Sequence, residues 1–401
     1  MFMLEASQKQ KAIELIAKSQ RITLLTHRDP DGDALGSLLA LLLVLQGLKK
    51  EVKAVYLGTP DAGFEFLPSY QKLTNRLQEE EVVFTLEGVA DSEATLMFRK
   101  DLERGALQIK ISFAEKSIEP NNVKVENKIF QPDTLIILDV SDLSQLQPEL
   151  SAAKEALGKA TILNIDHHKS NSGFGSVNLV DPAATATAEV LVSFLEALGS
   201  GLKEEFLPKD NSTPKTLSLF NPEVATCLLC GILTDTAMFQ NTNTTPKSLT
   251  VAAQLIGLGG RREEIVSHLK AQSLSQLKVK VRVIERIRLK KDFLYSYLFQ
   301  RDFEELGASE TDVSGIIDKE LKTVSGCKVV LLLVETKDGI RGRLRSLDDK
   351  IDVSKIAETF GGGGHRGAAG FLLHKEGSLE QFEEIAQRVF DAVNLQGDSL
   401  K

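Results

Sequence analysis

The chain has 401 residues, more than one hydrophobic core normally spans, so two or three domains are expected. Hydrophobic residues make up 42% and charged residues 26%, which excludes a disordered or fibrous chain. With 48 basic and 56 acidic side chains the formal net charge is −8, so no overall positive field is available to hold a long nucleic acid, although a local basic pocket remains compatible with this balance.

The apolar stretch at residues 34 to 48 predicts a buried helix, because it is too short for a bilayer and small and polar residues interrupt it. Residues 1 to 20 lack the basic start and apolar core of a secretory signal, so a cytoplasmic location without membrane attachment is expected. Three cysteines cannot build a disulfide framework. Cys227 and Cys230 lie in an apolar helical pattern, which favours buried packing over a redox or zinc site.

The first motif follows a helical stripe at residues 7 to 19 and a predicted strand at 21 to 26. It contains His27, Asp31 and Asp33, and a proline and a glycine in the same turn can curl these side chains towards one point. Imidazole and carboxylate without thiolate suit manganese or a similar divalent ion better than structural zinc. The alternative is an ordinary Asp-Gly turn that caps the next helix.

A second strand is expected at residues 51 to 56, and the character of the sequence changes between about residues 77 and 128. That segment holds no cluster of ligand-type residues. We interpret residues 79 to 127 as a β-rich insertion that could cover a cleft or build a dimer contact, so a homodimer is left open. Short strands are predicted within it at residues 82 to 86, 95 to 98 and 107 to 113.

The alternation of strands and helices resumes at residues 134 to 138, a continuous apolar run typical of a parallel sheet that is covered on both faces. The run ends at Asp139 and Asp142. A helix at residues 148 to 157 and a strand at 160 to 165 complete a βαβ unit. Open α/β sheets hold their ligands at the carboxyl ends of the strands, so these acids mark a candidate site.

The strand at 160 to 165 runs directly into Asp166, His167 and His168. Because side chains alternate on a strand, at most two of the three are expected to meet one ion, and the third to orient a neighbour or meet substrate. A satisfied histidine pair in a loop is the alternative. The other acidic strand ends weigh against it.

Two helices follow in the first domain. Residues 183 to 189 begin a helix that reaches about Leu198, and their small side chains would let hydroxyl or backbone groups approach a ligand, although close helix packing explains them equally well. A polar loop at 199 to 216 separates this helix from the next. The second helix begins at Pro222 and ends near Asp235, the last acidic position.

Residues 271 to 290 are rich in lysine and arginine, have a weak helical period, and are interpreted as a linker helix between domains at 1 to 270 and 291 to 401. The predicted fold is therefore α/β, with a parallel-sheet first domain and a smaller α/β second domain. In the second domain, strands are predicted at residues 293 to 299, 328 to 335 and 340 to 344, and helices at 309 to 321 and 379 to 393.

Four consecutive glycines at 361 to 364 precede His365 and Arg366. Each glycine costs backbone entropy on ordering, so the run is not expected to serve packing or helix formation. It allows backbone amides to crowd an anion, with the histidine and the arginine adding charge. A flexible linker is the alternative, but small apolar residues rather than serines and acids surround the run.

As a set, these motifs resemble the DHH/DHHA1 phosphoesterase superfamily over nearly the whole chain. The resemblance is strongest to its stand-alone oligoribonucleases (nanoRNases), which also remove phosphate from 3′-phosphoadenosine 5′-phosphate. It implies two manganese ions bridged by Asp139, with magnesium or cobalt as alternatives. One ion would be held by His27, Asp31 and Asp139, and the other by Asp33, Asp139, His167 and Asp235.

The same resemblance implies that His168 faces the scissile phosphate and that Asp166 acts through its neighbours. Two features depart from the family pattern: the insertion lengthens the gap between the first two motifs, and Gln240 stands where many relatives have a basic residue. The substrate's terminal base or phosphate would be held by Arg345, Ser346, Gly363, Gly364, His365 and Arg366.

The implied function is hydrolysis of short oligoribonucleotides or 3′-phosphoadenosine 5′-phosphate, by a water that two ions activate for in-line displacement. A cyclic dinucleotide phosphodiesterase uses the same elements and remains the main alternative. A RecJ-type exonuclease is disfavoured by the net charge, a pyrophosphatase by the second domain, and a non-catalytic nucleotide sensor by the intact motifs. With no tryptophan and four tyrosines, no regular stacking platform is expected, which also favours short substrates.

Overall fold

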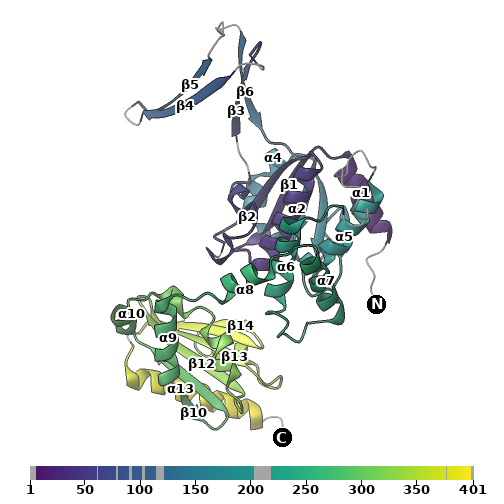
Figure 1. Cartoon of the computed structure of the whole chain (residues 1–401). Helices are drawn as coiled ribbons and strands as arrows, with labels where there is room; N and C mark the ends of the chain where they lie inside the picture. Colours follow the sequence, from purple (N-terminus) through teal and green to yellow (C-terminus); the bar gives the residue numbers. More distant parts are fainter. Residues whose placement is uncertain are drawn as a thin grey trace. The chain divides into compact units, whose positions relative to one another are not determined.

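The computed structural model of the protein describes eight stretches of the chain. It forms two compact units, Met1–Lys270 and Ala271–Lys401, whose elements are labelled in Figure 1. The described residues are 6 to 60, 62 to 77, 80 to 89, 93 to 101, 104 to 113, 122 to 202, 218 to 375 and 377 to 398.

The first unit is built on a five-stranded sheet in the order β2-β1-β7-β8-β9, and every neighbouring pair is parallel. The chain passes from β1 to β2 on one side and returns to the other side of β1 as β7. The strand order therefore reverses between β1 and β7, which is where open parallel sheets bind ligands. The strands are β1 (Arg21–Arg28), β2 (Glu51–Leu57), β7 (Thr134–Leu138), β8 (Thr161–Asp166) and β9 (Val177–Val180).

Strand β7 is buried along its whole length, as its apolar sequence predicted. Its alternate side chains enter two different cores, with Ile136 on one face of the sheet and Ile137 on the other. The parallel sheet and the α/β class are thus confirmed. The helices of this unit are α1 (Ala6–Lys18), α2 (Gly32–Gly47), α5 (Thr187–Gly201), α6 (Pro222–Asp235), α7 (Pro246–Gly257) and α8 (Arg262–Lys270).

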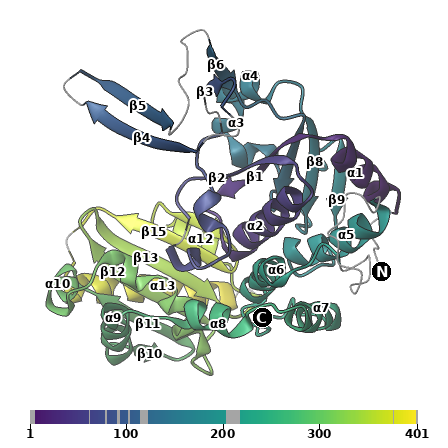
Figure 2. The ribbon, with the colours of Figure 1, turned by 45° about the horizontal axis from the view of Figure 1, so that its top comes forward.

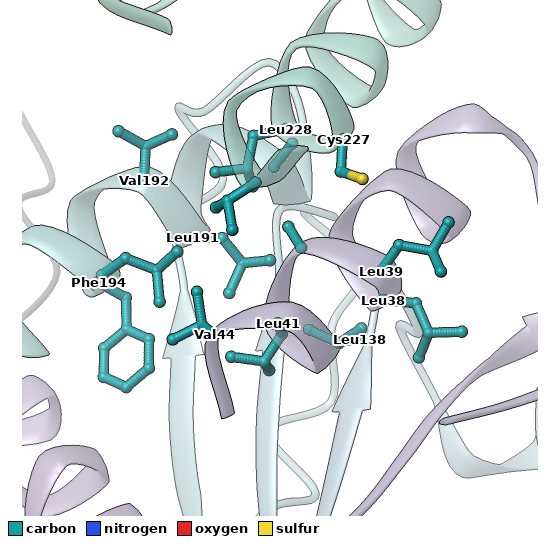
Figure 3. Packing of buried hydrophobic residues seen from close by; sticks show 14 of the residues in the cluster. Leu38, Leu39, Leu41, Val44, Leu138, Leu191, Val192, Phe194, Cys227 and Leu228 are labelled. Atoms are coloured by element: carbon teal, nitrogen blue, oxygen red, sulfur yellow. The ribbon is translucent and has the colours of Figure 1, made fainter. Parts of the chain in front are cut away.

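Helix α2 is the buried helix that the apolar run predicted. Figure 3 shows its Leu38 and Leu41 in one core with Leu191 of α5 and Cys227 of α6. A Cβ on Gly36 would lie 2.3 Å from the Cys227 carbonyl oxygen, so α2 and α6 can approach this closely only because residue 36 is glycine. Cys227 and Cys230 are fully buried, which confirms their packing role. Among the described residues, no helix is long and apolar enough to cross a bilayer.

The helix predicted at 148 to 157 is wrong in its continuity. The structure has two single-turn helices there, α3 (Glu149–Ala152) and α4 (Lys154–Leu157), and the core includes Ala153 between them and Leu157 of α4. Strand β9 was not predicted. Helix α5 begins later than expected, at Thr187, and extends into the expected polar loop, most of which (203 to 217) lies outside the described residues.

The insertion consists of two separate two-stranded antiparallel sheets, one of β3 with β6 and one of β4 with β5. Three of the four strands were predicted. The fourth, β6, was missed, although its valines alternate with charged residues in the manner of a strand. The bounds are β3 (Glu80–Leu86), β4 (Ala94–Asp101), β5 (Ala106–Phe113) and β6 (Val123–Ile129).

The second unit is built on a six-stranded mixed sheet in the order β10-β11-β12-β13-β15-β14, of which Figure 2 shows β12, β13 and β15 side by side. Only β11 and β12 are parallel to each other within this sheet. The strands are β10 (Arg288–Lys290), β11 (Phe293–Leu298), β12 (Val329–Thr336), β13 (Gly339–Ser346), β14 (Gly363–His365) and β15 (Ala368–Leu373).

Apolar residues cover the two faces of this sheet in separate cores. One core includes α12 (Val353–Glu358) and α13 (Leu379–Asp398), and the other includes α9 (Leu274–Glu285), α10 (Gln300–Leu306) and α11 (Ile316–Lys319). The long helix predicted at 309 to 321 is wrong, because a 3₁₀ turn, α11 and a second 3₁₀ turn occupy that stretch.

The segment expected to link two domains, residues 271 to 290, packs within the second unit. Val279 and Val283 of α9 are fully buried in its core. Arg282 and Arg286 both form ion pairs with Asp302, which is 1% exposed, so charge also ties α9 to α10.

The glycine run forms a hairpin, in which β14 pairs with β15. A Cβ on Gly362 would lie 2.1 Å from the Gly370 carbonyl oxygen, and Gly364 has φ +146°. The expectation that the run does not serve packing is therefore wrong at these two positions. The close approach of the glycine run to β15 requires glycine there.

Candidate metal and phosphate site

The first motif lies at the carboxyl end of β1. Nδ1 of His27 donates a hydrogen bond to the carbonyl oxygen of Arg28 at 2.9 Å, which leaves the lone pair of Nε2 free for a ligand. Nε2 lies 3.5 Å from Oδ2 of Asp139. Burial alone would lower the pKa of His27, but its hydrogen bonds and the nearby carboxylates raise it.

Asp31 caps helix α2. Its Oδ1 accepts hydrogen bonds from the backbone amides of Asp33 and Ala34 at 3.0 and 3.1 Å. This is the Asp-Gly cap that the sequence left open as an alternative, but the cap engages only one carboxylate oxygen. The residue therefore caps the helix and keeps the second oxygen for a ligand.

Asp33 is fully buried at the start of α2. Its two oxygens accept hydrogen bonds from the backbone amides of Thr187 and Ala188 at 2.6 and 2.9 Å, so the N-terminus of α5 holds the carboxylate. Burial, with the charges of Asp139 and Asp235, raises the pKa of Asp33 well above its usual range. A cation at this point would offset that repulsion.

Asp139 follows β7 directly and has a left-handed backbone, with φ +59°. A non-glycine residue in that region is strained, and such strain persists where the surroundings fix the residue. Its Oδ1 accepts the Thr187 hydroxyl proton at 2.9 Å. His167 Nε2 lies 3.6 Å from the same oxygen, so with His27 on Oδ2 the carboxylate stands between two imidazoles.

Asp166, the last residue of β8, is fully buried and organises the two histidines after it. Its Oδ1 accepts from His168 Nδ1 at 2.7 Å, and its Oδ2 accepts from the Asn171 side chain at 2.7 Å. Burial would raise the pKa of Asp166, but these bonds outweigh it and lower the pKa. In turn, Asp166 raises the pKa of His168 to about 9, while the His168 side chain stays 46% exposed.

Asp235 ends helix α6 rather than a strand, and its Oδ2 lies 3.5 Å from His167 Nε2. Burial is the largest of the effects that raise its pKa to about 6. The side-chain amides of Asn241 and Asn243 bind its backbone carbonyl at 3.2 Å, which fixes the end of the helix. A pocket of about 460 Å³ lies beside it, lined also by Asp31 and Phe64.

That at most two of Asp166, His167 and His168 meet one ion stays a prediction, although the histidines lie beyond the strand, since β8 ends at Asp166. The described residues form three groups whose ligand atoms lie within 4.8 Å of one another. Oxygen and imidazole donors without thiolate suit a divalent cation, so the residues fit a metal site. The groups are His27, Asp31 and Asp139; Asp33, His167 and Asp235; and Asp139, Asp166, His167 and His168.

In the second unit, Arg345 and His365 lie on one face of the sheet, because each is directly opposite Ala368 in the strand pairing. Arg345 makes two hydrogen bonds of 2.8 Å to Asp318, while His365 is exposed. Ser346 is occupied by a 2.8 Å bond to a backbone carbonyl. Arg366 binds the Asp349 carbonyl at 2.8 Å, and Gly363 and Gly364 form the first two positions of β14.

The sequence placed Thr187 within the small-residue run at 183 to 189 but did not assign it, or Asn171, to the site. In the structure the Thr187 hydroxyl donates to Asp139 and its backbone amide donates to Asp33. Asn171 stands five residues after Asp166, and no local pattern distinguishes it from a loop asparagine.

Comparison with known proteins gives two family models and several relatives. The model of the DHH family, N-terminal domain, matches residues 21–232, and the DHHA1 domain matches residues 290–394. A Thermus thermophilus protein named bifunctional oligoribonuclease and PAP phosphatase NrnA is 27% identical over 94% of this chain and 91% of its own length. The cyclic-di-AMP phosphodiesterase GdpP of Geobacillus thermodenitrificans is 26% identical over 94% of this chain and 48% of its own length.

Among solved structures, an exopolyphosphatase-related protein from Bacteroides fragilis has a TM-score of 0.71, with 18% identity and 99% of both chains covered. At this identity the match supports the fold alone. Both domains expected from the motifs are thus matched.

Proposed function

The chain belongs to the DHH family of phosphoester hydrolases, and from that membership we propose that it hydrolyses short oligoribonucleotides and 3′-phosphoadenosine 5′-phosphate. The observation that carries the proposal is the position of Asp139. It lies at the reversal of strand order and within 3.6 Å of two imidazoles from different strand ends. A shared carboxylate of this kind is what a pair of cations requires.

We assign His27, Asp31 and Asp139 to one divalent cation, and Asp33, Asp139, His167 and Asp235 to a second, with manganese as the metal. Two cations held there would lower the pKa of an attacking water and offset charge on the reacting phosphate. Thr187 and the backbone of α5 keep the carboxylates Asp139 and Asp33 in place during this step.

His168 supplies a hydrogen-bond donor for the reacting phosphate. Its Nδ1 proton is held by Asp166, and a pKa near 9 keeps the ring protonated at neutral pH. The side chain is 46% exposed, and its Nε2–H can donate to a phosphate oxygen. Asn171 positions this residue by holding Asp166.

Short substrates are favoured by the charge of the chain. A protein that tracks a long strand makes many phosphate contacts, and each steepens the salt dependence by a log-log slope of about 0.7. A chain of net charge −8 is poorly suited to that task. In the second unit, Arg345 and the exposed His365 are assigned to the terminal base or phosphate of a short substrate.

A second candidate activity is hydrolysis of cyclic dinucleotides. The supporting observation is that the GdpP relative is similar over 94% of this chain, although the match spans only 48% of that longer protein.

One experiment separates these activities. The full chain is incubated with manganese, magnesium or cobalt, or with chelator, and kcat/KM is measured on a dinucleotide, a pentanucleotide, a twenty-nucleotide RNA, 3′-phosphoadenosine 5′-phosphate and cyclic di-AMP. We expect the highest values on the dinucleotide to pentanucleotide. His168→Asn, prepared in parallel, should be inactive and excludes a contaminating nuclease. A kcat/KM that rises with RNA length and falls steeply with salt would contradict the proposal.

A further inference from the structure

Strand β13 carries three arginines, Arg341, Arg343 and Arg345, at alternate positions. Side chains two residues apart on a strand project to the same face, about 6.7 Å from one another. Their partners on β12 are Val334, Leu332 and Val330, whose side chains belong to the core beneath α9, α10 and α11. The three arginines therefore project on that face of the sheet, and we call them the arginine ladder.

Beyond the ladder, this face carries Leu372 opposite Arg341 and His365 at the end of β14, with only small residues between them. Ala368 and Gly370 of β15 stand opposite Arg345 and Arg343, and Gly363 of β14 stands opposite Gly370. A Cβ built on Gly363 would meet nothing within 4 Å. The strands thus offer a flat floor beside a row of guanidinium groups.

Only one arginine of the ladder has an acidic partner in the part of the chain that the structure describes. Arg345 pairs with Asp318. The side chains of Arg341 and Arg343 have no hydrogen bond or ion pair with any described residue, although both residues are half-buried. Burial, followed by the charges of its two neighbours, lowers the pKa of Arg343, so the ladder is a site of like-charge repulsion. An anion would relieve it.

We propose that Arg341 and Arg343 bind successive backbone phosphates of a short oligonucleotide, and that they thereby set how substrate length affects affinity. This rests on the proposed function, and it adds to it a subsite distinct from the terminal one assigned to Arg345 and His365. Two features carry the inference. The repeat of alternate residues along β13 is close to the phosphate repeat of an extended single strand, and a guanidinium group binds phosphate through two parallel hydrogen bonds.

The test measures binding rather than turnover. The full chain is kept in chelator so that no hydrolysis occurs, and fluorescence anisotropy gives Kd for a labelled dinucleotide and a labelled pentanucleotide over a range of salt. Arg343→Gln and Arg341→Gln should each raise Kd for the pentanucleotide about tenfold, which corresponds to the loss of one charged hydrogen bond. Each should also reduce the salt slope by about 0.7. Dinucleotide binding should stay within twofold.

Arg288→Gln is the matched control, because Arg288 is exposed on β10, at the opposite edge of the same sheet, and loses the same charge. This variant should leave Kd for the dinucleotide and for the pentanucleotide unchanged. Arg343→Lys keeps the charge but not the paired hydrogen bonds, so it should restore the salt slope and recover only part of the affinity. It also serves as the informative variant if Arg343→Gln fails to fold.

Equal weakening of both ligands in the ladder variants would overturn the inference, because the arginines would then belong to the terminal site. Unchanged pentanucleotide binding would overturn it as well. The inference and the proposed function can fail separately. If the protein hydrolyses none of the proposed substrates but the ladder variants still lose affinity for the pentanucleotide alone, only the proposed function is refuted.

Discussion

The acidic cluster of the first unit and the arginine ladder of the second are opposite in charge, and each brings like charges close together. Asp33 is fully buried and Asp139 is 5% exposed, and each accepts a hydrogen bond from Thr187 of α5. Arg341 and Arg343 are half-buried and have no acidic partner among the described residues. A divalent cation would offset the repulsion in the first region, and a phosphate group would offset it in the second.

A third region shows that burial of charge does not by itself indicate a ligand. Asp302 in the second unit is as buried as the acids of the first, but Arg282 and Arg286 both pair with it. The difference between Asp302 and Asp139 lies in their partners. Replacing each carboxylate by its amide should therefore give opposite results.

The largest effect is expected for Asp139→Asn. We expect kcat/KM to fall by about a thousandfold, since a carboxylate shared by two cations contributes several kcal/mol to the reaction. Manganese content, measured by mass spectrometry, should fall with it. The unfolding free energy of the metal-free protein should not fall, because the variant removes a like charge from the cluster.

Asp142→Asn is the control for this variant, because Asp142 lies three residues further on and is exposed. It should keep both metal and activity. Full activity of Asp139→Asn would refute the assignment of the bridging position.

The opposite result is expected for Asp302→Asn. Breaking a buried ion pair leaves two arginines without their partner, so the unfolding free energy should fall by about 3 to 5 kcal/mol. Metal binding should be unaffected. Glu305→Gln, which removes an exposed carboxylate paired with Arg282, should cost less than about 1 kcal/mol and serves as the control.

The cost of Asp302→Asn should also depend on pH. Burial would raise the pKa of Asp302, but hydrogen bonds from Arg286 and the Phe299 amide lower it below the usual value of 3.8. A carboxyl whose pKa is lowered on folding contributes its stability above the unfolded pKa and loses it as the pH falls through the folded pKa. Chemical denaturation should therefore show the full difference at pH 7 and a shrinking one below about pH 4. A difference independent of pH would mean that packing, not charge, accounts for the loss.

Asp139 and Asp166 could be read from the sequence because they stand at the ends of apolar strands, and the carboxyl ends of parallel strands converge. The buried helix α2 was equally readable from its composition. Thr187 could not be read in this way, because its partners Asp33 and Asp139 lie 154 and 48 residues away. Its role depends on where α5 begins, and small residues alone do not fix that point.

The arginine ladder illustrates the same limit. The sequence shows three alternating arginines, but only the strand pairing places them on the face that includes Gly370 and Gly363. The helix predicted at 309 to 321 failed for a related reason. Segments this short depend on the core they cover more than on their own helical preference.

A smaller effect is expected for Thr187→Val, which removes the hydroxyl that binds Asp139 and keeps the backbone amide that binds Asp33. Residues that orient a metal ligand typically change metal affinity or activity by about 10 to 100-fold. Manganese titration followed by calorimetry should show the loss, and Thr187→Ser should restore affinity because it restores the hydroxyl. Equal affinity of the valine and serine variants would show that the hydroxyl has no positioning role.

The smallest effect is expected within the glycine hairpin, where alanine substitutions at two neighbouring residues should differ in their effect on stability. A Cβ on Gly362 would lie 2.1 Å from the Gly370 carbonyl oxygen, whereas a Cβ on Gly363 would meet nothing within 4 Å. Gly362→Ala should force the strands apart and lower the unfolding free energy by about 1 to 3 kcal/mol, whereas Gly363→Ala should change it by less than about 0.5 kcal/mol. Gly363 lies on the floor beside the arginine ladder, so its methyl group should raise KM for a pentanucleotide more than for a dinucleotide, at unchanged stability. If both variants lost stability equally, the run would be required as a whole by the fold, and the floor would not be the open surface on which the ladder's role depends.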